Sequence, residues 1–169
     1  YGFLIKKPLK NGYKCCEKCY NHLVEISRSE KAKQARKKLL KDKIVEILGN
    51  YLKNLSNRDY MQFSEKYIKL IFYCIAMNLQ VFRVKSEMEV QRKYPDILIV
   101  PKDRTKGYAS VMIEFKYLKK TEENLLKQKQ EEARKQIEEY ASFEEIRNIE
   151  KLNKYTIVAV NDKLYVEKI

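Results

Sequence analysis

Residues 94–116 read YPDILIVPKDRTKGYASVMIEFK, and their pattern gives the strongest indication of the fold. Two runs rich in Ile and Val flank a polar turn with a proline and a glycine, a pattern typical of a β-hairpin. Because side chains alternate across a strand, Glu114 and Lys116 project from the same face of the second strand. Asp96 opens the partner strand. The other face of the second strand is apolar and is expected to be core: Val111, Ile113, Phe115 and Tyr117.

Two acids and a lysine on a central hairpin form a candidate site. An ionised carboxylate among apolar strands is costly unless it is paired or binds a metal. The alternative is a structural ion pair between Glu114 and Lys116, which would leave Asp96 unpaired.

The composition favours a globular domain that contacts a polyanion. The chain has 169 residues, 44% of them hydrophobic, and a net charge of +13 from 36 basic and 23 acidic residues. Such an excess favours nucleic-acid contact, although a lysine-rich surface that only aids solubility is the alternative. The longest apolar stretch, around residues 70–77, is too short for a bilayer, so no membrane partner is expected. We expect an intracellular protein (cytoplasmic, or nuclear if eukaryotic), and the start at Tyr1 favours a fragment of a longer chain.

The cysteines do not predict a metal site. Cys15, Cys19 and His22 lie close together but lack the second ligand pair that structural zinc requires. We therefore expect free thiols, with neither zinc nor a disulfide that the fold depends on.

The patterning predicts an N-terminal part, residues 1–59, and a core, residues 60–169. The first part has extended pieces and then a basic amphipathic helix to about residue 55. Its lysine-rich beginning is either a solvated helix face or a phosphate contact. The core is expected to have a helix over 60–79, strands over 81–90, 95–101 and 108–118, a helix over 122–143, and strands over 155–160 and 163–166. In its first helix Glu65 is either an acid favoured by the helix dipole or a metal ligand.

Three motifs in this order resemble the PD-(D/E)XK nuclease superfamily. They are Pro95–Asp96, the E-x-K triplet Glu114 to Lys116, and Gln136-x-x-x-Tyr140 on the next helix. The chain is similar in particular to the nuclease-like domain that follows an AAA-ATPase-like domain in many bacterial proteins. The resemblance implies an α/β fold: a restriction-endonuclease-like αβββαβ core with a central mixed sheet flanked by helices, here with an N-terminal helical extension. Members of the family usually carry glycines and an arginine just before the aspartate. The residues at these positions in this chain are Gln91, Arg92, Lys93, Tyr94 and Pro95.

The resemblance also implies a metal-dependent nuclease that hydrolyses phosphodiester bonds, of DNA rather than RNA. The implied catalytic residues are Asp96, Glu114, Lys116, Gln136 and Tyr140. The implied ligands of Mg²⁺ or Mn²⁺ are Asp96, Glu114 and Glu65. The expected nucleic-acid contacts are Lys33, Arg36, Lys37, Arg92 and Lys93.

Two other functions stay open at this point. One is a nuclease-fold module that binds nucleic acid without cutting it, and the other is a protein-interaction domain. A homodimer and a preceding ATPase-like domain are further expectations.

Overall fold

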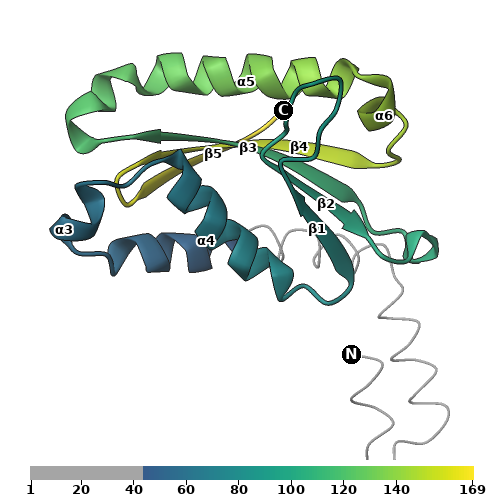
Figure 1. Ribbon diagram of the computed structural model, residues 1–169, viewed down its shortest axis with the longest axis horizontal. Helices are drawn as coiled ribbons and strands as arrows, with labels where there is room; N and C mark the ends of the chain where they lie inside the picture. The colour runs from purple at the N-terminus through teal and green to yellow at the C-terminus, as the bar shows by residue number, and fades with distance from the viewer. Residues whose placement is uncertain (1–43) are drawn as a thin grey trace, which may run out of the picture. The chain divides into compact units, whose positions relative to one another are not determined.

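The computed structural model describes residues 44–169, which form a five-stranded sheet with helices on both faces (Figure 1). The strands are β1 (Phe82–Ser86), β2 (Ile97–Pro101), β3 (Ser110–Leu118), β4 (Leu152–Val160) and β5 (Lys163–Lys168). The helices are residues 44–53, α3 (Asn57–Tyr60), α4 (Glu65–Met77), α5 (Leu126–Ser142) and α6 (Glu144–Arg147), with 3₁₀ turns η1 (Arg104–Lys106) and η2 (Lys120–Leu125). None of the helices in this part of the chain is long and apolar enough to cross a membrane.

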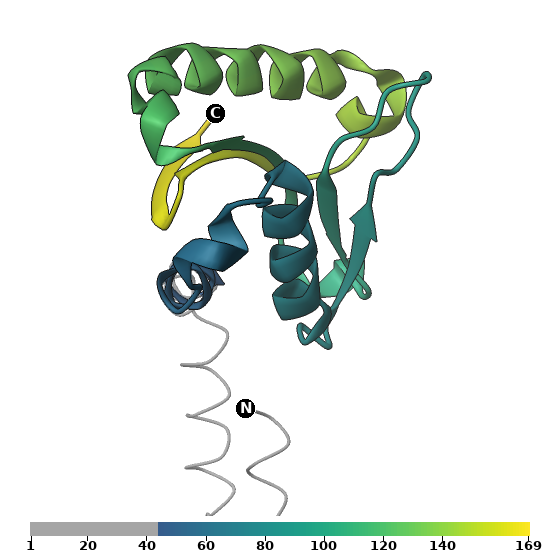
Figure 2. The ribbon, with the colours of Figure 1, turned by 60° about the vertical axis from the view of Figure 1, so that its left-hand side comes forward.

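The strands follow their sequence order across the sheet, which is mixed. The pairs β1–β2, β2–β3 and β4–β5 are antiparallel, and β3–β4 is parallel. Parallel neighbours need a long crossover instead of a tight turn. The segment with η2, α5 and α6 makes that crossover, and α5 packs on β3 and β4 (Figures 1 and 2). The predicted α/β fold with a central mixed sheet flanked by helices is confirmed.

Strand β3 is buried on both faces. On one face Phe115 packs against Phe72 of α4, with ring centroids 5.2 Å apart. On the other face Met112 joins a buried cluster with Ile137 and Tyr140 of α5. The prediction that assigned only the Phe115 row to the core was therefore incomplete. The row that contains Glu114 and Lys116 is also buried, because α5 lies across it.

The first core helix begins later than predicted. Ser56 and Asp59 form a capping box that starts the short helix α3, and α4 begins only at Glu65, after the cap residue Ser64. The capping box starts a separate short helix before residue 60, and residues 61–64 between α3 and α4 are not helical. The expected single helix over 60–79 is therefore wrong at its beginning.

The spacing of apolar residues predicts two apolar stripes on this helix and burial of much of its surface, and the structure buries only part of it. One stripe contains Tyr67, Leu70, Ile71, Cys74 and Ile75, and the other contains Ile68, Phe72 and Ala76. Ile68, Phe72 and Ala76 are buried and face the sheet, whereas Tyr67 and Leu70 are exposed. The sequence shows two apolar stripes on this helix, and only the packing decides which stripe faces the sheet.

Other boundaries shift by a few residues. Strand β1 ends at Ser86 rather than near residue 90, and α5 begins at Leu126 after the 3₁₀ turn η2. The predicted extended pieces and the basic beginning of the first helix lie outside the described residues. So do Lys33, Arg36, Lys37 and the cluster of Cys15, Cys16, Cys19 and His22.

The end of the predicted N-terminal helix lies within the described residues. Residues 44–53 are helical, and Ile44, Leu48 and Leu52 form their buried side. Ile47 and Tyr51 recur at the same helical spacing and would belong to this apolar side, but both are exposed. Cys74 of α4 is an exposed free thiol.

Candidate active site on the β2–β3 hairpin

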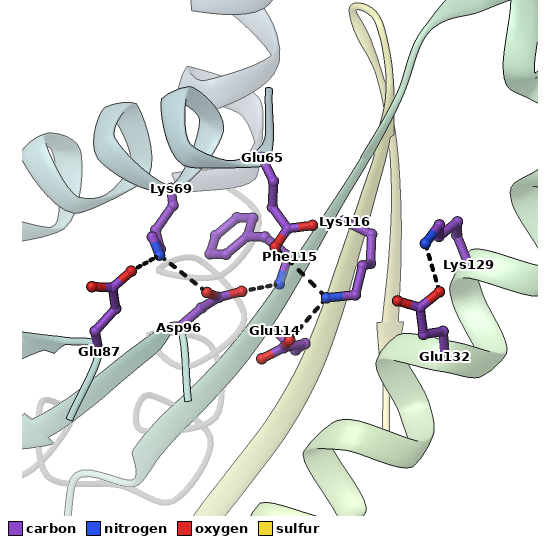
Figure 3. Close-up of polar contacts among 9 residues, drawn as sticks. All are labelled: Glu65, Lys69, Glu87, Asp96, Glu114, Phe115, Lys116, Lys129 and Glu132. Carbon is purple, nitrogen blue, oxygen red and sulfur yellow. Dashed lines mark hydrogen bonds and ion pairs between the residues drawn. The ribbon is translucent and has the colours of Figure 1, made fainter. Parts of the chain in front are cut away.

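The β2–β3 hairpin places Asp96 beside Glu114. In the register Ile97 pairs with Ile113, so one further step brings Asp96 opposite Glu114. The Asp96 carboxylate also accepts a hydrogen bond through Oδ2 from the backbone N–H of Phe115, at 2.8 Å (Figure 3). This bond ties the start of β2 to the middle of β3, between the two residues of the E-x-K motif.

Glu114 and Lys116 lie together, as strand alternation predicts. The Nζ of Lys116 is 3.0 Å from Oε1 of Glu114, and their side chains are only 7% and 4% exposed, respectively. The same Nζ is 3.7 Å from Oε1 of Glu65, at the first turn of α4. Three elements therefore bring Asp96, Glu114, Lys116 and Glu65 to one place (Figure 3).

Burial dominates the electrostatics of these groups. Burial raises the pKa of Glu114 to about 7, with a further contribution from the Asp96 charge, even though Lys116 opposes the shift. Burial also raises the pKa of Glu65. For Lys116, burial lowers the pKa, but the carboxylates of Glu114 and Glu65 outweigh it and the net pKa lies above the usual lysine value. At neutral pH Lys116 is therefore an ammonium, while Glu114 is present in both its protonated and its ionised form.

Helix α5 packs on β3 and brings Tyr140 near the site, and Gln136 lies one turn earlier on the same helix. Burial, and next the charges of Glu114 and Asp96, raise the pKa of Tyr140 to about 12, so its hydroxyl stays neutral. Oε1 of Gln136 is buried without a hydrogen-bond partner among residues 44–169, and so are Oε2 of Glu114 and Oγ1 of Thr156. Thr156 is the register partner of Glu114 on β4. Buried polar atoms without a partner in the protein can bind a ligand or water.

Two residues near the site were missed by the sequence reasoning, Lys69 and Thr156. Lys69 lies one turn after Glu65 on α4 and 3.3 Å from Asp96. The spacing of four from Glu65 is the signal that could have identified it, because residues four apart share a helix face. Thr156 has no such signal, since only the β3–β4 register brings it to Glu114.

The basic residues predicted for nucleic-acid contact fall into three groups. Arg92 is exposed at the tip of a two-residue hairpin whose flanking residues Val90 and Lys93 exchange backbone hydrogen bonds of 2.8 and 2.9 Å. Gln91 and Arg92 adopt φ values of 49° and 65°, the left-handed conformation that glycine favours. Lys93 forms an ion pair with Glu139 of α5. The other three lie outside the described residues.

The donor chemistry fits a hard divalent ion, but the ligands are not preassembled. Among residues 44–169 no group of three or more His, Cys, Asp or Glu side chains is arranged to hold a metal. Asp96 and Glu114 nevertheless supply carboxylate oxygens, which Mg²⁺ and Mn²⁺ prefer, and Oε2 of Glu114 has no hydrogen-bond partner in this part of the chain. A metal ion on Asp96 would meet the amine of Lys69, which already contacts that carboxylate.

Comparison with known protein families matches residues 63–169 to the PD-(D/E)XK nuclease superfamily. The matched range runs from the loop before α4 to the end of β5 and so includes every described residue of the site. Searches of curated proteins and of solved structures found no match. The match covers more than half of the chain, and the chain therefore belongs to the PD-(D/E)XK nuclease superfamily.

Proposed function

We propose that this domain is a divalent-metal-dependent nuclease that hydrolyses phosphodiester bonds of DNA. The observation that supports this most directly is the convergence of Asp96, Glu114 and Lys116 on the β2–β3 hairpin, beside Glu65 of α4. A structural ion pair between Glu114 and Lys116 would not require a second carboxylate tied to the backbone between them.

Asp96 and Glu114 are the proposed ligands of Mg²⁺ or Mn²⁺, with Glu65 as a third carboxylate that reaches the ion directly or through water. When bound, the ion would polarise the scissile phosphate and provide a nucleophile at neutral pH. The hydrogen bond from Phe115 to Asp96 fixes the orientation of one carboxylate before any ligand arrives.

Lys116 is proposed to act through its charge. Its ammonium lies between Glu114 and Glu65, where it can hold the attacking water and stabilise negative charge that develops on the phosphate. Because its pKa is raised, Lys116 is a poor general base and a permanent positive charge at neutral pH. Tyr140 keeps its proton and can donate a hydrogen bond to a phosphate oxygen. Gln136 is proposed to orient the site or to contact the phosphate backbone.

A nucleic-acid substrate agrees with the charge of the chain. The net charge of +13 favours binding to a polyanion, and Arg92 presents its side chain on an exposed hairpin tip. Lys33, Arg36 and Lys37 remain proposed backbone contacts. A homodimer and an ATPase-like domain earlier in a longer chain also stay predictions.

The test is a cleavage assay on labelled duplex DNA, single-stranded DNA and RNA, each with Mg²⁺, Mn²⁺ or EDTA. We expect DNA cleavage that requires the metal and is abolished in Asp96→Ala but retained in Glu138→Ala, an exposed acid of α5. Salt-sensitive DNA binding with no cleavage under any condition would instead identify a binding module. A protein that neither binds nor cuts DNA or RNA would favour the protein-interaction function.

A further inference from the structure

Besides Lys116, the site contains another lysine, Lys69, which forms an ion pair with Asp96. The Nζ of Lys69 lies 3.3 Å from Oδ1 of Asp96, while Oδ2 accepts the hydrogen bond from Phe115 (Figure 3). Both oxygens of this carboxylate are therefore engaged. The pair is largely shielded from water, since the side chains of Lys69 and Asp96 are 15% and 10% exposed.

The same amine has a second partner at the surface. Lys69 also forms an ion pair with Glu87, whose side chain is 60% exposed. Glu87 follows β1 and donates its backbone N–H to the carbonyl of Asp96, at 3.1 Å, so the two acids stay close to each other. Lys69 can therefore loosen its contact with the inner carboxylate and still keep a carboxylate partner.

The net charge of the groups around the site would balance one divalent ion. Lys116 contacts Glu114 and Glu65, and Lys69 contacts Asp96 and Glu87. Four carboxylates against two ammonium groups leave two negative charges when all are ionised. A divalent ion on Asp96 would nevertheless face the ammonium of Lys69 at close range, and like charges at such a distance repel strongly in a poorly hydrated site.

We propose that Lys69 is a positioning residue that occupies Asp96 while no metal is bound, and that releases this carboxylate to an incoming divalent ion while it stays paired with Glu87. The inference rests on the proposed metal site. It adds that the affinity of this site for metal is set by competition with a lysine outside the E-x-K motif. A lysine with a purely structural role would instead keep its contact with Asp96 whether or not metal is present.

The test measures Mn²⁺ binding by isothermal titration calorimetry on the full chain. Lys69→Met keeps most of the aliphatic stem and removes the competing charge. We expect it to bind Mn²⁺ about tenfold more tightly than the wild type, which corresponds to about 1.4 kcal/mol. Lys69→Arg should restore the wild-type affinity. The matched control is Lys66→Met, an exposed lysine of the same helix, which should change the affinity little.

Thermal unfolding supplies a second readout. Without metal, Lys69→Met should melt at a lower temperature than the wild type, because Asp96 is left buried without a cation. Saturating Mn²⁺ should remove this difference. A melting temperature that falls equally with and without Mn²⁺, together with an unchanged affinity, would assign Lys69 a structural role and overturn the proposal. An equal increase of Mn²⁺ affinity in Lys66→Met would also overturn the proposal. It would show that removing any positive charge from this helix raises the affinity.

Glu87→Gln keeps the proposal testable even if Lys69→Met does not fold, because Glu87 lies at the surface. Loss of the outer partner should hold Lys69 on Asp96 and weaken Mn²⁺ binding by about threefold, as expected of an exposed charge pair. In the Lys69→Met background the same change should have little effect. An unchanged affinity in Glu87→Gln contradicts the proposal.

The outcomes also separate this proposal from the proposed function. If the wild type binds Mn²⁺ and the Lys69 and Glu87 variants bind it equally well, only the role of Lys69 is wrong. If neither the wild type nor any variant binds Mn²⁺, both proposals fail. If only Lys69→Met binds, the competition is confirmed and the wild-type domain is not a metal-dependent enzyme under those conditions.

Discussion

Asp96 and Phe115 are joined by a 2.8 Å hydrogen bond from the backbone N–H of Phe115 to the Asp96 carboxylate. The bond lies between the two strands that carry the candidate site, and it comes from the residue between Glu114 and Lys116. The side chain that is proposed to bind metal therefore also completes the backbone hydrogen bonding of β3.

This double role predicts that two substitutions of Asp96 will differ. Asp96→Ala leaves the buried N–H of Phe115 without its acceptor and should lower the free energy of unfolding by about 1–3 kcal/mol. Asp96→Asn can keep the hydrogen bond through its amide oxygen and should be closer to the wild type in stability. Both should lose Mn²⁺ binding and cleavage, because neither retains the charge. Chemical denaturation and calorimetry check this prediction, and Mn²⁺ binding at wild-type affinity by Asp96→Asn would contradict it.

The second prediction concerns Lys116→Met, which removes the charge and keeps most of the stem. If the ammonium acts mainly in the transition state, cleavage should fall by about two to four orders of magnitude while Mn²⁺ and DNA binding persist. Single-turnover cleavage and separate binding titrations measure these effects.

The alternative structural role of Lys116 predicts a different pattern. Glu114 would lose its partner, and the main effect would be a destabilisation of several kcal/mol. A variant that melts like the wild type and cuts DNA at an undiminished rate would remove Lys116 from the mechanism.

The third prediction concerns the pH dependence of stability without metal. The pKa of Glu114 is raised from 4.5 to about 7 in the folded protein, chiefly by burial. A carboxyl with a raised pKa stabilises the fold fully below its unfolded value and loses that contribution as the pH rises through the folded value. The stability of the wild type, compared with that of Glu114→Gln, should therefore fall between about pH 4.5 and pH 7.

At about 1.4 kcal/mol per pKa unit, the relative loss is about 3 kcal/mol at most. Glu65 shifts in the same direction, whereas the pKa of Glu87 is lowered by its bond to Lys69 and affects stability only at more acidic pH. Urea titrations in EDTA at several pH values measure the difference. Parallel pH profiles for the wild type and Glu114→Gln would show that burial does not perturb this carboxyl.

The fourth prediction concerns Gln136→Leu. Oε1 of Gln136 is buried without a hydrogen-bond partner in the described part of the chain, so an apolar side chain of similar size should cost little stability. If Gln136 orients the site, cleavage should fall by about 10- to 100-fold, the usual effect of losing a residue that supports a metal site.

Thermal melts and cleavage rates check this prediction, with Gln128→Leu, at an exposed position of the same helix, as the control. Full activity in Gln136→Leu would leave the Q-x-x-x-Y glutamine without a role in the reaction.

Features that depend on local periodicity could be predicted from the order of the amino acids. The alternation of side chains along residues 110–118 places Glu114 beside Lys116, and the apolar runs around a turn predict the hairpin that brings Asp96 to them. The order of helices and strands also follows from such patterns, and together with the three motifs it supports the resemblance that implies the α/β fold.

Features that depend on packing between distant segments could be identified only in the folded protein. Lys69 reaches Asp96 because Ile68, Phe72 and Ala76 bury one face of α4, whereas the sequence also offered a stripe that contains Tyr67 and Leu70. Thr156 meets Glu114 through the β3–β4 register, and α5 buries the polar row of β3. Burial and charge pairing arise when separate elements of the fold meet. The raised pKa of Glu114 and the contact between Lys69 and Asp96 therefore cannot be predicted from any local sequence pattern.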